Sequence, residues 1–113
     1  MAKKVAVVIQ EDPRKTHRPV EALRIALGLS AGSHQTTVVL LGEAARLLSE
    51  DTDDIIDSDI LEQYLPSLNQ LAVPFVLHSS TSASSIRKEF TARYDTDEKI
   101  RALLSSMDRT LIF

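Results

Sequence analysis

Cysteine and tryptophan are absent from the 113 residues, and glycine and aromatic side chains are scarce. Without a thiol the chain cannot form disulfides, attack as a thiol nucleophile, carry a persulfide or bind a metal through cysteine. Two tyrosines and three phenylalanines are too few for a stacking platform that binds single-stranded nucleic acid. The three glycines, Gly28, Gly32 and Gly42, do not form the glycine-rich loop of Rossmann and P-loop phosphate sites.

An excess of basic residues and a long apolar run are also missing. The formal net charge of −3 leaves no basic footprint, so no nucleic-acid partner is expected. No stretch approaches the roughly 20 apolar residues of a membrane span. The first four residues lead directly into Val5–Ile9, which is too short for the apolar core of a secretion signal. We therefore expect a cytoplasmic protein that does not interact with membranes.

Apolar runs and amphipathic segments alternate along a chain that is long enough for one domain, 1–113. Buried strands are predicted where the runs are continuous or β-branched, over 4–10, 35–41, 74–78 and, at the end, 109–113. Helices are predicted between them, over 19–31, 43–48, 58–71, 85–91 and after Asp95. This order predicts a three-layer α/β/α domain with a mainly parallel sheet of about four to five strands, in a flavodoxin-like topology.

Three local features refine these predictions. Asp95 and Glu98 have the spacing of a capping box at the start of the last helix. Pro66 is expected to kink the helix over 58–71 or to divide it in two. The acidic residues between Glu50 and Asp59 lack the glycine and terminal glutamate of an EF-hand loop. We interpret them as a solvated loop with Asp57 or Ser58 as a helix cap.

Several segments resemble the DsrE/DsrF-like (TusD/TusC-like) family of small sulfur-relay proteins, across nearly the full chain. The resemblance is carried by Val5–Ile9 with the helix over 21–27, and by Thr37–Ala45, Leu71–His78 and Asp108–Phe113. It implies the family fold and assembly into trimers or hexamers. Family members carry sulfur as a persulfide on a cysteine just after the third strand. That position corresponds here to His78, or to Ser79 if the turn is offset by one.

The carboxyl end of the strand over 74–78 is the predicted site, because ligands of open parallel sheets bind beyond the strand ends. His78 is there either a strand-end histidine bonded to neighbouring backbone, or a ligand-binding or acid–base group. The hydroxyl groups that follow form either an anion pocket at a helix start, with Arg87, or ordinary turn and cap residues. They are Ser79, Ser80, Thr81 and Ser82. His17 lies in the loop after the first strand and could approach the same edge.

Three functions remain open from the sequence. The leading hypothesis is a non-catalytic DsrE/DsrF-like subunit, which forms a homo-oligomer or docks with a cysteine-bearing DsrE-like partner. The alternatives are a small-molecule or nucleotide-binding α/β module and an enzyme that uses His78 as acid–base. A serine hydrolase is not supported, because no G-x-S-x-G motif is present. No cofactor or metal is expected, since His17, His34 and His78 lack metal-ligand spacing.

Overall fold

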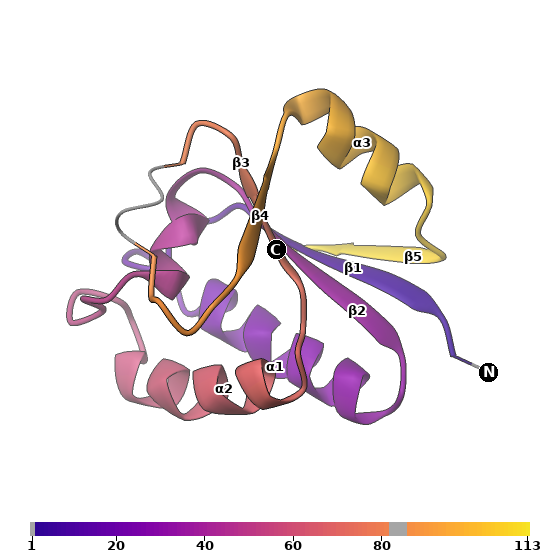
Figure 1. Ribbon diagram of the computed structural model, residues 1–113. Coiled ribbons are helices and arrows are strands. Elements are labelled where there is room, and N and C mark those ends of the chain that lie inside the picture. The colour runs from indigo at the N-terminus through magenta and orange to yellow at the C-terminus, as the bar shows by residue number, and fades with distance from the viewer. Residues whose placement is uncertain (1, 82–85) are drawn as a thin grey trace.

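Five strands form one parallel sheet, in the order β4-β3-β2-β1-β5, in the computed structural model, which describes residues 2–81 and 86–113 (Figure 1). Every neighbouring pair of strands is parallel. The apolar runs predicted four of these strands, and the fourth along the chain was missed. The strands are β1 (Lys4–Ile9), β2 (Gln35–Leu40), β3 (Phe75–His78), β4 (Ala92–Asp95) and β5 (Arg109–Ile112).

Helices cover both faces of the sheet, which confirms the three-layer α/β/α prediction (Figure 1). Helices α1 (Arg18–Ala31) and α2 (Ser58–Gln70) pack against each other on one face. A 3-10 helix, η1 (Gly42–Leu48), lies between them in the chain, and α3 (Asp97–Ser105) covers the opposite face. As predicted, α1 begins with a proline in its first turn and ends at Gly32.

Side chains of the three central strands alternate between two hydrophobic cores, as the two-residue period of a strand requires. The larger core lies under α1, α2 and η1 and includes Val7, Leu40 and Phe75. The smaller core contains Val8, Val39 and Val76, and Ile100 is the buried contribution of α3 to it. The α3 face is therefore held by fewer apolar contacts than the face beneath α1 and α2.

The segment after β3 differs from the prediction of a helix over 85–91. Residues 86–91 are not helical, and Ile86 instead forms an isolated bridge with Ser49. Phe90 packs edge-to-face on Phe75, with ring centroids 5.4 Å apart. Burying these two apolar side chains against the existing core outweighs the hydrogen bonds of one short, marginal helix. The chain then runs directly into β4, which pairs with β3.

Of the two predicted helix caps, the one for α3 is wrong and the one for α2 is confirmed in position only. Asp95 belongs to β4, and Thr96 caps α3 by accepting a hydrogen bond from the Lys99 N–H at 3.4 Å. Asp57 occupies the cap position of α2, but with a positive φ of 62° and no capping side-chain bond. The structure therefore places the α3 cap one residue later than the sequence predicts.

Pro66 lies inside one continuous α2, so the predicted division into two helices is wrong. An interior proline costs about 3 kcal/mol. The helix also buries Leu61, Leu65 and Leu68, and each buried leucine contributes about 1.5–3 kcal/mol. Packing against the sheet and α1 therefore exceeds the cost of the proline and keeps the helix whole.

Arg87 joins its own segment to two segments that precede it in the chain. Its side chain is only 15% exposed and forms an ion pair with Glu62 of α2. Its Nε donates to the Ser49 carbonyl oxygen at 2.9 Å, while Glu62 accepts a further bond from Thr52 Oγ1 at 2.9 Å. The guanidinium thus connects the segment after β3 to the end of η1 and to α2.

Replacing Phe75 by alanine should remove the largest side chain of the main core and its contact with Phe90. We expect Phe75→Ala to lower the free energy of unfolding by about 3–5 kcal/mol, measured by urea denaturation. Leu71→Ala is the matched control, because Leu71 is 45% exposed and should change stability by only about 0.5 kcal/mol. Equal effects of the two substitutions would show that the core is not centred on Phe75.

The Glu62–Arg87 pair should make stability depend on pH. The hydrogen bond from Arg87 lowers the pKa of Glu62 below its usual 4.5. A carboxyl group whose pKa is lowered by folding stabilises the fold above its unfolded pKa, and this contribution is lost as the pH falls through the folded pKa. The stability difference between wild type and Glu62→Gln should therefore be greatest near pH 7 and shrink below pH 4.5. In an Arg87→Met background, Glu62→Gln should change the pH dependence less, because the largest cause of the lowered pKa of Glu62 is then missing and only the bond from Thr52 lowers it. In the wild-type background, a stability difference that stays constant with pH contradicts this account.

Candidate functional site

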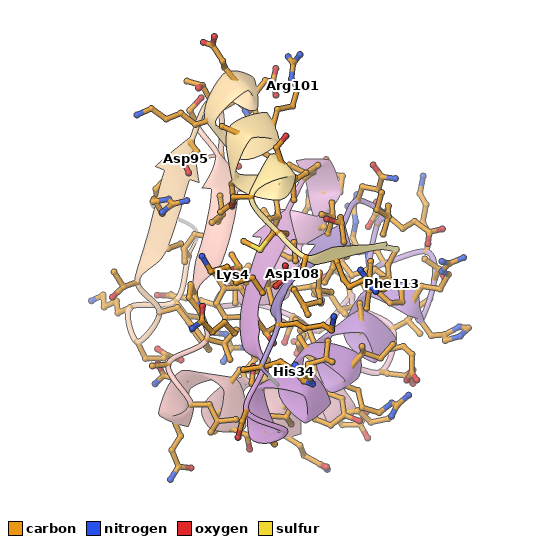
Figure 2. All side chains as sticks on the ribbon, turned by 90° about the vertical axis from the view of Figure 1, so that its right-hand side faces the viewer. Lys4, His34, Asp95, Arg101, Asp108 and Phe113 are labelled. Carbon is orange, nitrogen blue, oxygen red and sulfur yellow. The ribbon has the colours of Figure 1, made fainter. Side chains whose placement is uncertain are left out.

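A cavity of about 540 Å³ opens at the carboxyl end of β3, beside the start of α3. Figure 2 shows Asp95 on β4 and Arg101 on α3 at this end of the molecule. The lining residues come from the end of β3, the following turn and the first turns of α3. They are His78, Ser79, Thr96, Asp97, Glu98 and Arg101. The predicted location of the site, at the end of β3, thus coincides with a cavity.

The pairing of β3 with β4 brings these segments together. His78 lies opposite Asp95 in the register, and the Ser79 N–H continues the ladder by donating to the Asp95 carbonyl oxygen at 2.9 Å. Only Thr96 separates β4 from α3. Because the strands are parallel, the end of β3 and the start of α3 must lie at the same edge of the sheet.

Both ring nitrogens of His78 are engaged by neighbouring groups. Nδ1 accepts the Ser80 N–H at 3.1 Å and lies 2.8 Å from Ser80 Oγ. Nε2 lies 2.9 Å from Asp97 Oδ1. A backbone N–H can only donate, so Nδ1 is the acceptor and the hydrogen that faces Asp97 is on Nε2. The Nε2–H therefore donates to the Asp97 carboxylate.

This arrangement combines the two interpretations of His78 that the sequence left open. The ring is held by local bonds, as a structural strand-end histidine would be. It also lines a cavity with 28% of its side chain exposed, and the side chain of its partner Asp97 is 74% exposed. A ligand in the cavity can thus reach both members of the pair from solvent.

The charges around the cavity are mixed. Asp97 and Glu98 stand in the first turn of α3, where carboxylates are favoured by the positive end of the helix dipole. Arg101 lies one turn further along the same helix. An anion bound in the cavity would lie near both carboxylates, which would repel it. The cavity is therefore suited to a ligand with both donors and acceptors better than to a simple anion.

The predicted hydroxyl groups have different positions. Ser79 lines the cavity, Ser80 bonds to the His78 ring, and the Thr81 N–H donates to the His78 carbonyl oxygen at 2.9 Å, closing the turn. Ser82 lies outside the residues that the structure describes. Residues 86–91 form no helix, so the helix start proposed to complete an anion pocket here is not supplied by them.

Arg87 and His17 do not line this cavity. Arg87 is engaged by Glu62 and Ser49. His17 is an exposed residue at the start of α1, where its carbonyl oxygen accepts the Glu21 N–H at 3.1 Å. Sequence reasoning missed Asp97, Glu98 and Arg101. The capping pattern did locate a helix start near them, but only the pairing of β4 places it beside His78.

Ion pairs occupy another part of the carboxyl end of the sheet, around the loop after β1. Arg14 bonds Asp12 at 2.8 Å and lies 3.5 Å from Glu43. The hydrogen bond from Arg14 lowers the pKa of Asp12 to about 2. Arg18 is paired with Glu11 at 3.0 Å and lies over the Phe113 ring. These two arginines are thus already neutralised by carboxylates, which argues against a phosphate site in the loop after β1.

Within residues 2–81 and 86–113, no cluster of three or more histidine, aspartate or glutamate side chains has the arrangement of a metal site. None of the helices in this part of the chain is both long and apolar enough to cross a bilayer.

Comparisons with known proteins agree with the fold and the resemblance. The model of the DsrE/DsrF-like family matches residues 3–108. The fold is similar to the crystal structure of the ychN protein from E. coli, with a TM-score of 0.75 and 17% sequence identity over 98% of this chain and 99% of that one. No curated protein matches the chain significantly. The structural likeness establishes the fold alone, and the family match, which spans most of the sequence, establishes that the chain belongs to the DsrE/DsrF-like family.

Proposed function

We propose that this chain is a non-catalytic subunit of the DsrE/DsrF-like type, related to intracellular sulfur relay, which works through assembly and does not itself carry sulfur. Its assembly partner is another copy of the chain or a cysteine-bearing DsrE-like protein. Membership in a family whose members often form oligomers supports this proposal. The observation that carries it is His78 at the end of β3, in a chain without any thiol.

The chemistry of sulfur transfer supports the non-carrier role. A persulfide forms when a sulfur atom is added to a thiolate, so the carrier must supply a sulfur of its own. An imidazole nitrogen and a hydroxyl oxygen cannot replace it. Both nitrogens of His78 are moreover engaged, by Ser80 and Asp97. Any sulfur that passes through an assembly containing this chain would therefore reside on a partner.

One observation favours a second candidate, a histidine-dependent acid–base enzyme. Ser80 Oγ, the His78 ring and the Asp97 carboxylate form a continuous chain of contacts of 2.8 and 2.9 Å, and His78 and Asp97 line the cavity. Such a chain can relay a proton between a bound ligand and the carboxylate. For this candidate, an activity of the wild-type protein must be lost in His78→Ala while folding is retained.

The non-carrier role predicts the result of a sulfur-labelling experiment. Incubation with glutathione persulfide labelled in its outer sulfur should leave wild-type protein unlabelled after gel filtration. His78→Cys should retain label, because it places a partly exposed thiol at the end of β3, and the label should be released by a reducing agent. Stable label on the wild-type protein would contradict the proposal, and the His78→Cys sample shows that the assay can detect a carrier.

The assembly role predicts the mass of the native protein. Native mass spectrometry of protein purified from its own source, at low concentration, should show a trimer, a hexamer or a complex with a small cysteine-containing protein. A monomer that carries a small bound molecule would contradict the assembly role and favour the ligand-binding alternative.

A further inference from the structure

The two edges of the sheet differ in how they are protected. Edge strands with unpaired backbone groups tend to pair with other chains, and charged side chains commonly prevent this. At the β4 edge, Arg93 forms an ion pair with Asp95 at 2.7 Å. At the β5 edge, every residue is exposed, and Thr110, Leu111 and Ile112 follow Arg109 without a further charge. Leu111 is 37% and Ile112 59% exposed.

The hydrogen bonds to β1 reveal which backbone groups of β5 are free for pairing. The Phe113 N–H donates to the Val8 carbonyl oxygen at 2.8 Å, and the Phe113 carbonyl oxygen accepts the Gln10 N–H at 2.8 Å. Alternate residues of a strand repeat this orientation, so Leu111 also faces β1. Thr110 and Ile112 therefore direct both their N–H and their C=O away from the sheet.

From this pattern we infer that β5 pairs antiparallel with β5 of a second copy, about a two-fold axis at Leu111. Thr110 of each copy then lies opposite Ile112 of the other, and each such pair exchanges two N–H···O bonds. This register uses all the outward groups of Thr110 and Ile112, so the segment is complementary to itself, as a two-fold interface requires. The inference rests on the proposed assembly role and specifies the interface.

Other registers or directions of the β5–β5 pair leave backbone groups unpaired or bring the positive charges of the two Arg109 side chains together. A two-fold at Thr110 would place Ile112 opposite Asp108, whose N–H is already bonded to Lys4, and would bring the two Arg109 residues closer. A parallel pair would not be symmetric and would leave a free edge on each new copy. With the axis at Leu111, Arg109 lies opposite Phe113 of the second copy. The assembly is then even-numbered, a dimer or a hexamer made of two trimers.

The side chains also fit this pairing. Leu111 is in register with Val7 and Ile112 with Val8, so they lie on opposite faces of the sheet. The two Leu111 side chains would meet at the axis on the α1 face. On the α3 face, each Ile112 would lie beside Thr110 of the second copy. Both exposed apolar side chains of β5 would thus be covered by one interface. Figure 2 shows Phe113 at the end of this strand.

Single cysteines test the register, since the native chain has none. Residues at the axis form a non-hydrogen-bonded pair with Cα atoms about 4.5 Å apart, which suits a disulfide. Oxidised glutathione should convert Leu111→Cys protein to a disulfide dimer, each bond consuming two thiols and releasing two molecules of glutathione. Arg109→Cys is the control, because four residues, about 13 Å, would separate its two copies. Cross-linking of both variants alike, or of neither, overturns the inference.

A proline variant tests the free backbone groups. Thr110→Pro removes an N–H that points away from β1, so the ladder with β1 is kept and only the outer edge is blocked. We expect the dissociation constant of the two-fold contact to rise at least tenfold by analytical ultracentrifugation, with an unchanged far-UV circular dichroism spectrum. If Thr110→Pro does not fold, Ile112→Lys replaces it. This variant should also raise the dissociation constant, because it places a positive charge from each copy at the interface.

The outcomes distinguish this inference from the proposed function. An oligomer that persists in Thr110→Pro or Ile112→Lys, and that does not cross-link through Leu111→Cys, overturns the β5 interface but keeps the assembly role. A wild-type protein that is monomeric in native mass spectrometry overturns both. Selective cross-linking of Leu111→Cys, with weakened association of Thr110→Pro, supports both.

Discussion

The parallel pairing of β3 with β4 determines the position of the remaining elements. Once His78 and Asp95 are in register, α3 must begin at the carboxyl edge of the sheet and beside His78. From there α3 crosses the face opposite α1, and the chain reaches the far edge to add β5 next to β1. The pairing of β4 with β3 thus places the cavity beside the end of β3, and it leaves β5 as the exposed strand at the opposite edge of the sheet.

The chemistry at the cavity is limited by what the chain does not contain. A DsrE/DsrF-like domain without cysteine keeps the scaffold, but it lacks the atom on which sulfur would be carried. His78 occupies the end of β3 and is held by Ser80 and Asp97. The exposed position of Asp97 leaves this pair accessible. The cavity thus presents a histidine–carboxylate pair to solvent in place of a thiol.

Stability in this domain comes from long-range packing that overrides local preferences. Ile86 and Phe90 are spaced for one face of a helix, yet both are buried in the larger core without a helix between them, Ile86 in a bridge with Ser49 and Phe90 on the Phe75 ring. Arg87 fixes the path of this segment through its bonds to Glu62 and Ser49. Pro66 is tolerated within α2 for the same reason, since the leucines around it are buried. In both segments the burial of apolar surface exceeds the local hydrogen-bonding terms.

The sequence by itself determined the elements whose signals are local. Continuous apolar or β-branched runs predicted β1, β2, β3 and β5, and the proline and glycine that bound α1 predicted its ends. The position of His78 at a strand end followed from the same pattern, and the missing thiol excluded sulfur carriage. These properties depend on residues close together in the chain, so periodicity and composition are sufficient.

Only the tertiary structure decided the features that join distant segments. β4 has only four residues, and it forms a strand because the edge of β3 is available for pairing. No pattern in the sequence near β4 indicates this pairing. The contact between His78 and Asp97 depends on that pairing, and the separation of Arg87 from the cavity depends on its bonds to Glu62 and Ser49. The orientation of the free groups of β5 depends on its register with β1. Such features arise from hydrogen bonds and apolar burial between segments far apart in sequence, and their energies are determined by the assembled sheet.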